Sequence, residues 1–205
     1  MFPDTGLRLF AIVPAAGHSR RMGRPKLLLP LGQGTVISQM LSILVRPEIA
    51  ATMVVVRKDD VALQQAAAAS GATVLQPDIP PPEMRQSVEH ALRQIEQHLS
   101  PQPDDGWLLV PADHPLLEPR IIEQVIAAWR ANPGKILIPV HAGRRGHPTL
   151  FPFSLVPEVF ILPPDQGLNR LVVAHAALVH EIEVDSPSVI ADLDTPEDYE
   201  RLQQP

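Results

Sequence analysis

Short apolar runs alternate with longer amphipathic segments along this chain, and the alternation predicts strands that are each followed by a helix. Runs of large apolar or β-branched residues that are bounded by turn residues are typical of buried strands. The predicted strands are Leu7–Val13, Met53–Val56, Thr73–Leu75, Trp107–Val110, Ile136–Val140 and Ala177–Val184.

Helices are predicted where apolar residues recur every three or four positions, as Val88, Leu92 and Ile95 do. Capping residues and prolines mark the helix ends. The predicted helices are Val36–Val45 behind the N-cap Thr35, an alanine-rich segment from Asp59 or Asp60 to near Ser70, Glu83–Leu99, Pro119–Ala131, two short helices within Phe153–His175, and a last helix capped by Thr195 with Pro196 at its first position.

Strands that alternate with helices at these lengths predict an α/β protein with a doubly wound, mainly parallel sheet. Helices on both faces would make this a three-layer, Rossmann-like α/β/α arrangement. The polar stretch Pro101–Gly106 is too short for a domain linker and leads directly into a strand. We therefore expect residues 1–205 to form a single domain.

Composition narrows the classes of function. The formal net charge of −6 argues against a general nucleic-acid binder, which would carry a basic footprint. The absence of cysteine excludes disulfides, a thiol nucleophile and a thiolate metal site. The chain has no apolar run long enough for a membrane span, and its start, Met1–Phe10, lacks the basic and apolar regions of a signal peptide. A soluble, cytoplasmic protein is the expectation.

The first predicted strand leads into the segment Pro14–Lys26, PAAGHSRRMGRPK. Small residues open this loop, and Arg20, Arg21, Arg24 and Lys26 follow within seven positions. Backbone N–H groups and cations at such a loop suit phosphate binding, and open α/β sheets bind ligands at the carboxyl ends of their strands. The alternative is a solvated basic turn. Because the protein as a whole is acidic, a small anionic ligand fits better than a polymer.

Carboxylates follow two later strands. Asp113 lies between Pro111 and Pro115 just past a buried strand, so it is expected at the same sheet edge as the basic loop. A carboxylate there suits Mg²⁺, which takes oxygen ligands and usually keeps waters and substrate phosphates. Asp192 and Asp194 follow the last strand, and alternate residues can direct both carboxylates to one side. The alternatives are that Asp113 caps the next turn and that the later pair only starts the last helix.

Other polar candidates carry weaker signals. His147 stands between Gly146 and Pro148, and His114 stands next to Asp113; either is a candidate ligand contact or a structural histidine. Ser87, at the start of a predicted helix, could offer a donor to a nucleotide. Arg144 and Arg145 are candidate phosphate contacts or a solvated loop.

The sequence lacks a P-loop, a G-x-G-x-x-G fingerprint, a G-x-S-x-G elbow and an H-E-x-x-H motif. A phosphate cradle with a carboxylate-held Mg²⁺ can instead run nucleotidyl transfer. That reaction needs positioning and electrostatic stabilisation but no nucleophilic side chain.

Four blocks of the sequence resemble the nucleotidyltransferases that complete the molybdenum cofactor. PAAGHSRRMGRPKLLLPLG is similar to their L-A-A-G-x-S-x-R-M-G-x-x-K signature, and PADHPLL to their G-D-Q-P-L segment. RGHPTLF resembles their G-H-P-x-L-F segment, and DLDTPEDY their D-I-D-T-P-E-D-L ending. The blocks occur in the family's order and span Pro14 to Tyr199. The resemblance implies the nucleotide-diphospho-sugar transferase fold, and the Ala-Ala-Gly start favours the cytidylyltransferase side of the family.

The resemblance also implies roles for residues of this chain. Ala15, Ala16 and Gly17 would lie along the base and ribose, while Ser19, Arg21 and Lys26 would hold the triphosphate. Asp113 would bind Mg²⁺, Asp192 or Asp194 would supply the second carboxylate, and His147 would border the pterin of the acceptor. This assigns catalysis to Arg21, Lys26 and Asp113. Ser87, a candidate from its place at the start of a helix, completes the predicted nucleotide contacts.

Several positions depart from the family pattern. Pro14 replaces the usual Leu, Ala112 replaces Gly, and His114 replaces Gln beside the metal-binding Asp. The stretch Glu83–Ser87 keeps only part of a Gly-Met-Ser-x-Ser-like run. These departures line the expected pocket, so the chemistry of the superfamily is a safer inference than the identity of the acceptor.

The leading prediction is therefore an enzyme, a Mg²⁺-dependent nucleotidyltransferase that transfers CMP from CTP to molybdopterin, with molybdoenzymes as recipients of the product. One alternative is a related transferase that joins GTP or another NTP to a different phosphorylated acceptor, such as a sugar phosphate. Another is a nucleotide- or cofactor-binding chaperone without turnover.

Overall fold

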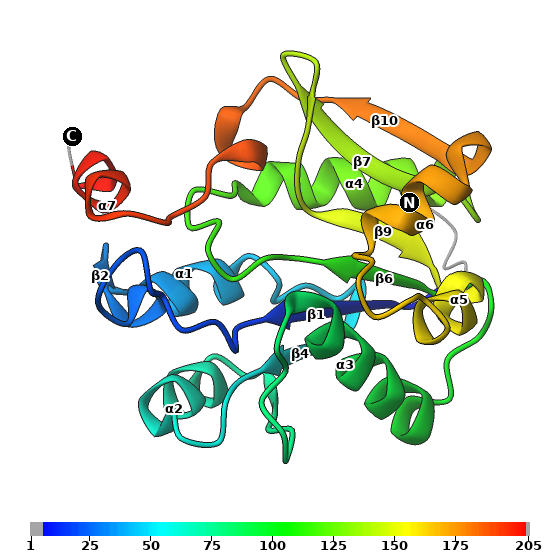
Figure 1. Cartoon of the computed structure of the whole chain (residues 1–205). Coiled ribbons are helices and arrows are strands. Elements are labelled where there is room, and N and C mark those ends of the chain that lie inside the picture. The colour runs from blue at the N-terminus through cyan, green and yellow to red at the C-terminus, as the bar shows by residue number, and fades with distance from the viewer. Residues whose placement is uncertain (1–5, 204–205) are drawn as a thin grey trace.

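The apolar runs of the sequence form the strands of a central sheet in the computed structural model, which describes residues 6–203 (Figure 1). Residues 1–5, which begin the segment Met1–Phe10 that lacks signal-peptide features, lie outside the described residues. Within residues 6–203, eight strands join in one sheet of order β10-β7-β9-β6-β1-β4-β5, with β8 paired to β7. The strands are β1 (Leu9–Pro14), β4 (Ile49–Val55), β5 (Thr73–Leu75), β6 (Gly106–Leu109), β7 (Ile136–His141), β8 (Arg144–Arg145), β9 (Thr149–Pro152) and β10 (Val179–Glu183).

Strand direction places the ends of most strands at one edge of the sheet. β1 pairs in parallel with β4 and with β6, and β5 and β10 extend the two sides in parallel with their neighbours. β9 runs antiparallel to both β6 and β7. The carboxyl ends of the parallel strands and the beginning of β9 therefore share one edge, which faces the left of Figure 1. The short hairpin of β2 (Pro30–Leu31) and β3 (Gly34–Thr35) lies at the same end.

Helices cover both faces of the sheet, as the alternation of side chains along β1 requires. Leu9, Ala11 and Val13 point into the core beneath α1, α2 and α4, whereas Phe10 and Ile12 point into the core beneath α3, α5 and α6. The predicted mainly parallel, doubly wound arrangement is confirmed. The helices are α1 (Val36–Ser42), α2 (Val61–Ala69), α3 (Met84–Leu99), α4 (Pro119–Ala131), α5 (Val156–Phe160), α6 (Asn169–Ala174) and α7 (Pro196–Leu202).

The predicted helix caps form as expected. Thr35 and Thr195 each accept from the backbone N–H three residues later, and each belongs to a capping box. Asp60, not Asp59, caps α2 by accepting from Leu63 N at 3.2 Å. None of the helices described within residues 6–203 is long and apolar enough to cross a membrane.

The segment between β7 and α5 holds the main difference from the sequence prediction. His141 pairs with Arg144 across a tight turn at Ala142 and Gly143, which have φ values of 49° and 75°. Two residues of positive φ are the usual connection of a two-residue hairpin, but Ala is not the residue that signals one. The chain then runs back as β9, whose four residues are all buried and show no period. The predicted last strand is also shorter, because Ala176–Leu178 forms a 3₁₀ turn.

Candidate active site

The loop after β1 is anchored by apolar residues and exposes its polar ones. Ala15, Met22 and Leu27 are buried in the core beneath α1. Ser19 adopts a left-handed φ of 48°, and Gly23 N donates to Ser19 O at 3.1 Å, so the chain turns tightly around the buried Met22. A Cβ on Gly17 would meet no atom within 4 Å. The loop is therefore fixed at its base and open to a ligand at Gly17.

Lys26 and the predicted carboxylates meet at the carboxyl edge of the sheet. Lys26 Nζ lies 2.7 Å from Asp113 Oδ2 and 3.0 Å from Asp194 Oδ1. Arg21 Nη2 lies 2.7 Å from Asp194 Oδ2, but its side chain is mostly exposed, whereas the Lys26 side chain is only 13% exposed. Segments that are far apart in the sequence thus form one charged cluster.

Backbone hydrogen bonds fix the two carboxylates relative to each other. Leu193 N donates to Asp113 O at 2.8 Å, which ties the segment before α7 to the loop after β6. Asp198 Oδ2 accepts from Asp194 N at 2.9 Å and from Thr195 N at 2.7 Å, so the N-cap of α7 also sets the position of Asp194. Capping and site geometry therefore depend on the same few residues.

The charges of the cluster shift the titration of Asp194. Burial alone would raise the pKa of Asp194, but the hydrogen bond and charge of Lys26, together with a hydrogen bond to Asp192 and the charge of Arg21, hold that pKa below its ordinary value. Asp194 is thus a carboxylate at neutral pH, available to cations.

Two histidines lie beyond Asp113. The rings of His114 and His147 meet edge to face, with centroids 5.4 Å apart. Burial lowers the pKa of His114 despite the nearby Asp113 and Asp192. Burial, with a smaller contribution from His114, lowers the pKa of His147 to about 4. Both imidazoles are therefore neutral at pH 7 and bring hydrogen-bonding capacity without charge.

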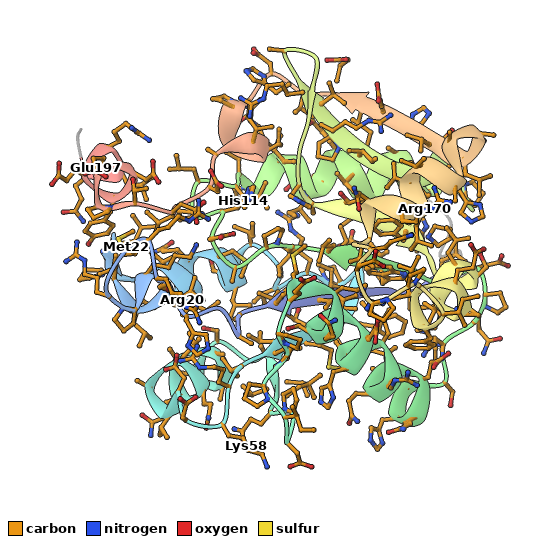
Figure 2. The ribbon with its side chains drawn as sticks, viewed as in Figure 1. Arg20, Met22, Lys58, His114, Arg170 and Glu197 are labelled. Atoms are coloured by element: carbon orange, nitrogen blue, oxygen red, sulfur yellow. The ribbon has the colours of Figure 1, made fainter. Side chains whose placement is uncertain are left out.

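Three adjoining cavities lie along this edge among the described residues. The charged cavity, of about 260 Å³, contains the Lys26 cluster. The proline cavity, of about 400 Å³, shares Gly17, Arg20 and Asp113 with it and is walled by Pro81, Pro82 and Ser87. The apolar cavity, of about 390 Å³, adjoins the second at Met84 and is lined by His147 and by residues of β6, β7 and β9. Figure 2 shows Arg20 and His114, which come from two different loops, toward the same end of the sheet.

The donor set of the charged cavity suits a divalent cation that arrives with phosphates. Asp113 and Asp194 both line this cavity, and their side chains are 27% and 15% exposed. Within residues 6–203 no group of three or more His, Asp or Glu side chains forms a cage for a metal ion. Mg²⁺ commonly binds one or two carboxylates and takes its other ligands from water and substrate phosphates. These residues fit such a Mg²⁺ ion and do not fit an all-protein metal site.

The structure brings most of the predicted site residues to these cavities. Ala15, Gly17, Ser19, Arg21, Lys26, Asp113 and Asp194 line the charged cavity. Ala16 and Ser87 line the proline cavity, and His147 lines the apolar cavity. Asp192 is exposed and lies outside the lining of all three, beside Asp194. The catalytic, binding and metal roles of these residues stay predictions.

The remaining basic residues near this edge differ in their surroundings. Arg20 lines both the charged and the proline cavity, although no specific role was predicted for it. The Arg24 guanidinium lies over the ring of Tyr199 in α7, 5.2 Å from its centroid. Arg145 pairs with Glu181 at 2.7 Å and borders the apolar cavity. Arg57, two residues after β4, is not among the predicted site residues, although its position after a strand that pairs in parallel with β1 is a sequence signal for this edge.

Comparison with known proteins adds relatives to this geometry. The family model described as "MobA-like NTP transferase domain" matches residues 11–179. The chain is 24% identical over 192 residues to the molybdenum cofactor cytidylyltransferase of Escherichia coli, covering 92% of each chain. It is 25% identical over 207 residues to the purine catabolism protein PucB of Bacillus subtilis, covering 96% of each.

Solved structures agree with the fold. Rv0371c from Mycobacterium tuberculosis superimposes with a TM-score of 0.79 at 28% identity, over 95% of this chain and 97% of that protein. The same protein has been solved in complex with manganese. More distant nucleotidyltransferases share the fold too. One of them, a nucleotidyl transferase from Methanothermobacter thermautotroptrophicus, superimposes with a TM-score of 0.77 at 19% identity. The expected nucleotide-diphospho-sugar transferase fold is confirmed.

Proposed function

The chain belongs to the MobA-like NTP transferase domain family and is a nucleotidyltransferase, and from this premise we propose that it transfers CMP from CTP to molybdopterin with release of pyrophosphate. The observation that carries the proposal is the charged cluster. The basic loop after β1 and carboxylates from two distant segments meet around one cavity at the carboxyl edge of the sheet, with Lys26 at its centre.

We assign the triphosphate to the charged cavity. Arg20, Arg21 and Lys26 line it and supply positive charge, and Ser19 adds a hydroxyl. In the free protein Lys26 neutralises Asp113 and Asp194; with CTP bound, its ammonium would turn to the phosphate oxygens. Lys26 would then stabilise the negative charge that develops as the bond between the α- and β-phosphates breaks.

The carboxylates have a complementary role. Asp113 and Asp194 would hold a divalent cation, with Asp192 as a nearby negative charge. When bound there, Mg²⁺ would supply Lewis-acid chemistry toward the phosphates that Arg20, Arg21 and Lys26 orient. Because Lys26 occupies the space between the carboxylates, its ammonium would have to move toward the phosphates before Asp113 and Asp194 could hold a cation.

The reaction itself needs no covalent intermediate. A terminal phosphate oxygen of the acceptor attacks the α-phosphate of CTP in line, the new phosphoanhydride bond forms, and pyrophosphate leaves with the electron pair of the broken bond. The contribution of the protein is to orient two anionic reactants and to screen their charges. The absence of cysteine and of a nucleophile motif is consistent with this chemistry.

The acceptor is assigned to the apolar cavity. Its lining includes Leu109, Ile138 and Phe151, which suit a flat ring system, and Arg145 at its border suits a phosphate. His147 is neutral at pH 7 and lines the same cavity, so it can hydrogen-bond a heteroaromatic ring without adding charge. This supports molybdopterin over a sugar phosphate.

A second candidate is a transferase of the same chemistry with another NTP or another phosphorylated acceptor. The similar identities to a molybdenum cofactor cytidylyltransferase and to a purine catabolism protein support this candidate. So do His114 and Ala112, which replace residues usual in the cofactor family.

The test is turnover of the purified full chain with Mg²⁺, molybdopterin and each of the four NTPs in parallel, with pyrophosphate release as the readout. The proposal expects release with CTP only when molybdopterin is present. Release with GTP or ATP instead would favour the second candidate. Tight binding of nucleotide without pyrophosphate from any pair would indicate a binding protein and defeat the enzymatic proposal.

A further inference from the structure

The loop after β1 is held from the neighbouring strand by a residue that lines none of the three cavities. Arg57 follows the end of β4, and its side chain is 14% exposed. Its Nη1 donates to Ala16 O at 3.3 Å and to Gly17 O at 2.9 Å. One guanidinium nitrogen thus fixes two consecutive carbonyl groups of the loop.

The planarity of the peptide bond determines what this contact does to the opposite side of the loop. In a trans peptide the N–H points away from the C=O of the same unit. With the carbonyls of Ala16 and Gly17 turned to Arg57, the N–H groups of Gly17 and His18 point away from it. Among residues 6–203 neither N–H donates to a backbone carbonyl. Gly17 lines the charged and proline cavities, and His18 lines the proline cavity.

Arg57 is itself fixed by the start of α2. Its Nε donates to Asp59 Oδ1 at 3.0 Å, and its Nη2 lies 3.5 Å from Asp60 Oδ2. Asp60 is also the N-cap of α2, and Gln64 Nε2 donates to Arg57 O at 2.9 Å. The guanidinium therefore has little freedom, and the loop carbonyls that it holds have little freedom either.

We propose that Arg57 is a positioning residue for nucleotide binding, which keeps the Gly17 and His18 N–H groups aimed at hydrogen-bond acceptors of the nucleotide. This inference rests on the proposed function, because it needs a nucleotide in these cavities. Preorganised donors bind more tightly than donors that must be ordered on binding, since the entropy of ordering has been lost during folding. Arg57 touches no substrate atom and acts only through the loop.

The experiment compares Arg57→Ala and Arg57→Lys with a matched control elsewhere. Arg46 has the same kind of environment: its side chain is 19% exposed, Nε donates to Ile43 O at 2.9 Å, and Nη2 donates to Pro119 O at 3.1 Å. Arg46 follows the end of α1 that is remote from the site. Arg46→Ala therefore measures the effect of losing a mostly buried guanidinium that holds backbone carbonyls, without a change in the site itself.

Calorimetric titration of each full-length variant with CTP and Mg²⁺ gives the dissociation constant, and a thermal melt gives the stability. We expect Arg57→Ala to weaken CTP binding about tenfold, which is the effect of losing about one hydrogen bond between the loop and CTP. Free guanidinium at millimolar concentration should restore binding to Arg57→Ala, and Arg57→Lys should retain part of it. Arg46→Ala should melt at a lower temperature and bind CTP as the unsubstituted chain does.

Two results overturn the inference. One is a dissociation constant for Arg57→Ala within twofold of the unsubstituted value; the other is an equal loss of CTP binding in Arg46→Ala. If the unsubstituted chain binds no nucleoside triphosphate at all, the proposed function fails first and this inference falls with it.

Discussion

Gly146 offers a sharp test of how the acceptor side of the site is built. A Cβ placed on Gly146 would lie 2.2 Å from Val189 O and 2.7 Å from Val189 C, which are backbone atoms and cannot rotate away. The next residue, His147, donates its N–H to the same Val189 O at 2.8 Å. The substitution Gly146→Ala therefore forces the two segments apart where a hydrogen bond holds them together.

The size of the effect follows from these distances. Relieving the clash to an ordinary contact of roughly 3.5 Å needs a displacement of about 1 Å, which breaks the hydrogen bond between His147 and Val189. The lost hydrogen bond costs about 1 kcal/mol and the overpacking about 1–3 kcal/mol. A free-energy loss of about 3 kcal/mol lowers the melting temperature of a protein of this size by about 10 °C.

Calorimetry of Gly146→Ala measures this loss, and Gly17→Ala is the matched control. A Cβ on Gly17 meets no atom within 4 Å, so that variant should melt within about 2 °C of the unsubstituted chain. The displaced turn at Val189 leads on to Asp194, so Gly146→Ala should also bind CTP more weakly. If Gly146→Ala melted at the same temperature as Gly17→Ala, the packing of Val189 against Gly146 would not be the constraint described above.

Three further predictions concern the charged cluster and the histidines. Lys26→Ala and Asp113→Ala should each abolish pyrophosphate release with the melting temperature little changed; near-normal turnover in either would refute their assignment. Without nucleotide, Lys26→Ala should bind Mn²⁺ more tightly than the unsubstituted chain in a calorimetric titration, because its ammonium no longer occupies Asp113 and Asp194; unchanged or weaker binding would speak against a shared site. Burial lowers the pKa of His147 from 6.5 to about 4, so the unfolded chain binds more protons between these values and stability should fall by about 3 kcal/mol as the pH drops through this window. Denaturant titrations should show a smaller fall for His147→Gln, and an identical fall would refute this.

The sequence was sufficient for the parts of the site that depend on local rules. Lys26 and Asp113 each follow a predicted central strand, and parallel strands end at one edge, so their proximity could be expected. The helix caps Thr35 and Thr195 could also be predicted, because each threonine hydroxyl accepts from a backbone N–H only three positions later.

Features that depend on tertiary packing could not be predicted in this way. Asp192 and Asp194 are equivalent by spacing, yet Asp194 lines the cavity because Leu193 and Asp198 orient it. The proposed role of Arg57 depends on the carbonyls of Ala16 and Gly17, which the loop after the neighbouring strand β1 brings to its guanidinium. β9 is buried on both sides but too short to carry a period.

The reversed strand β9 divides the rim of the cleft into two parts of different construction. Where β1, β4 and β6 end, the chain continues into loops that contact helices and the Lys26 cluster, and a change there would disturb the phosphate chemistry proposed above. Across from them, the hairpin of β7 and β8 and the entry to β9 reach the same rim without any helix of their own. Residues proposed to contact the acceptor can therefore change in evolution while the residues proposed for phosphate transfer stay the same.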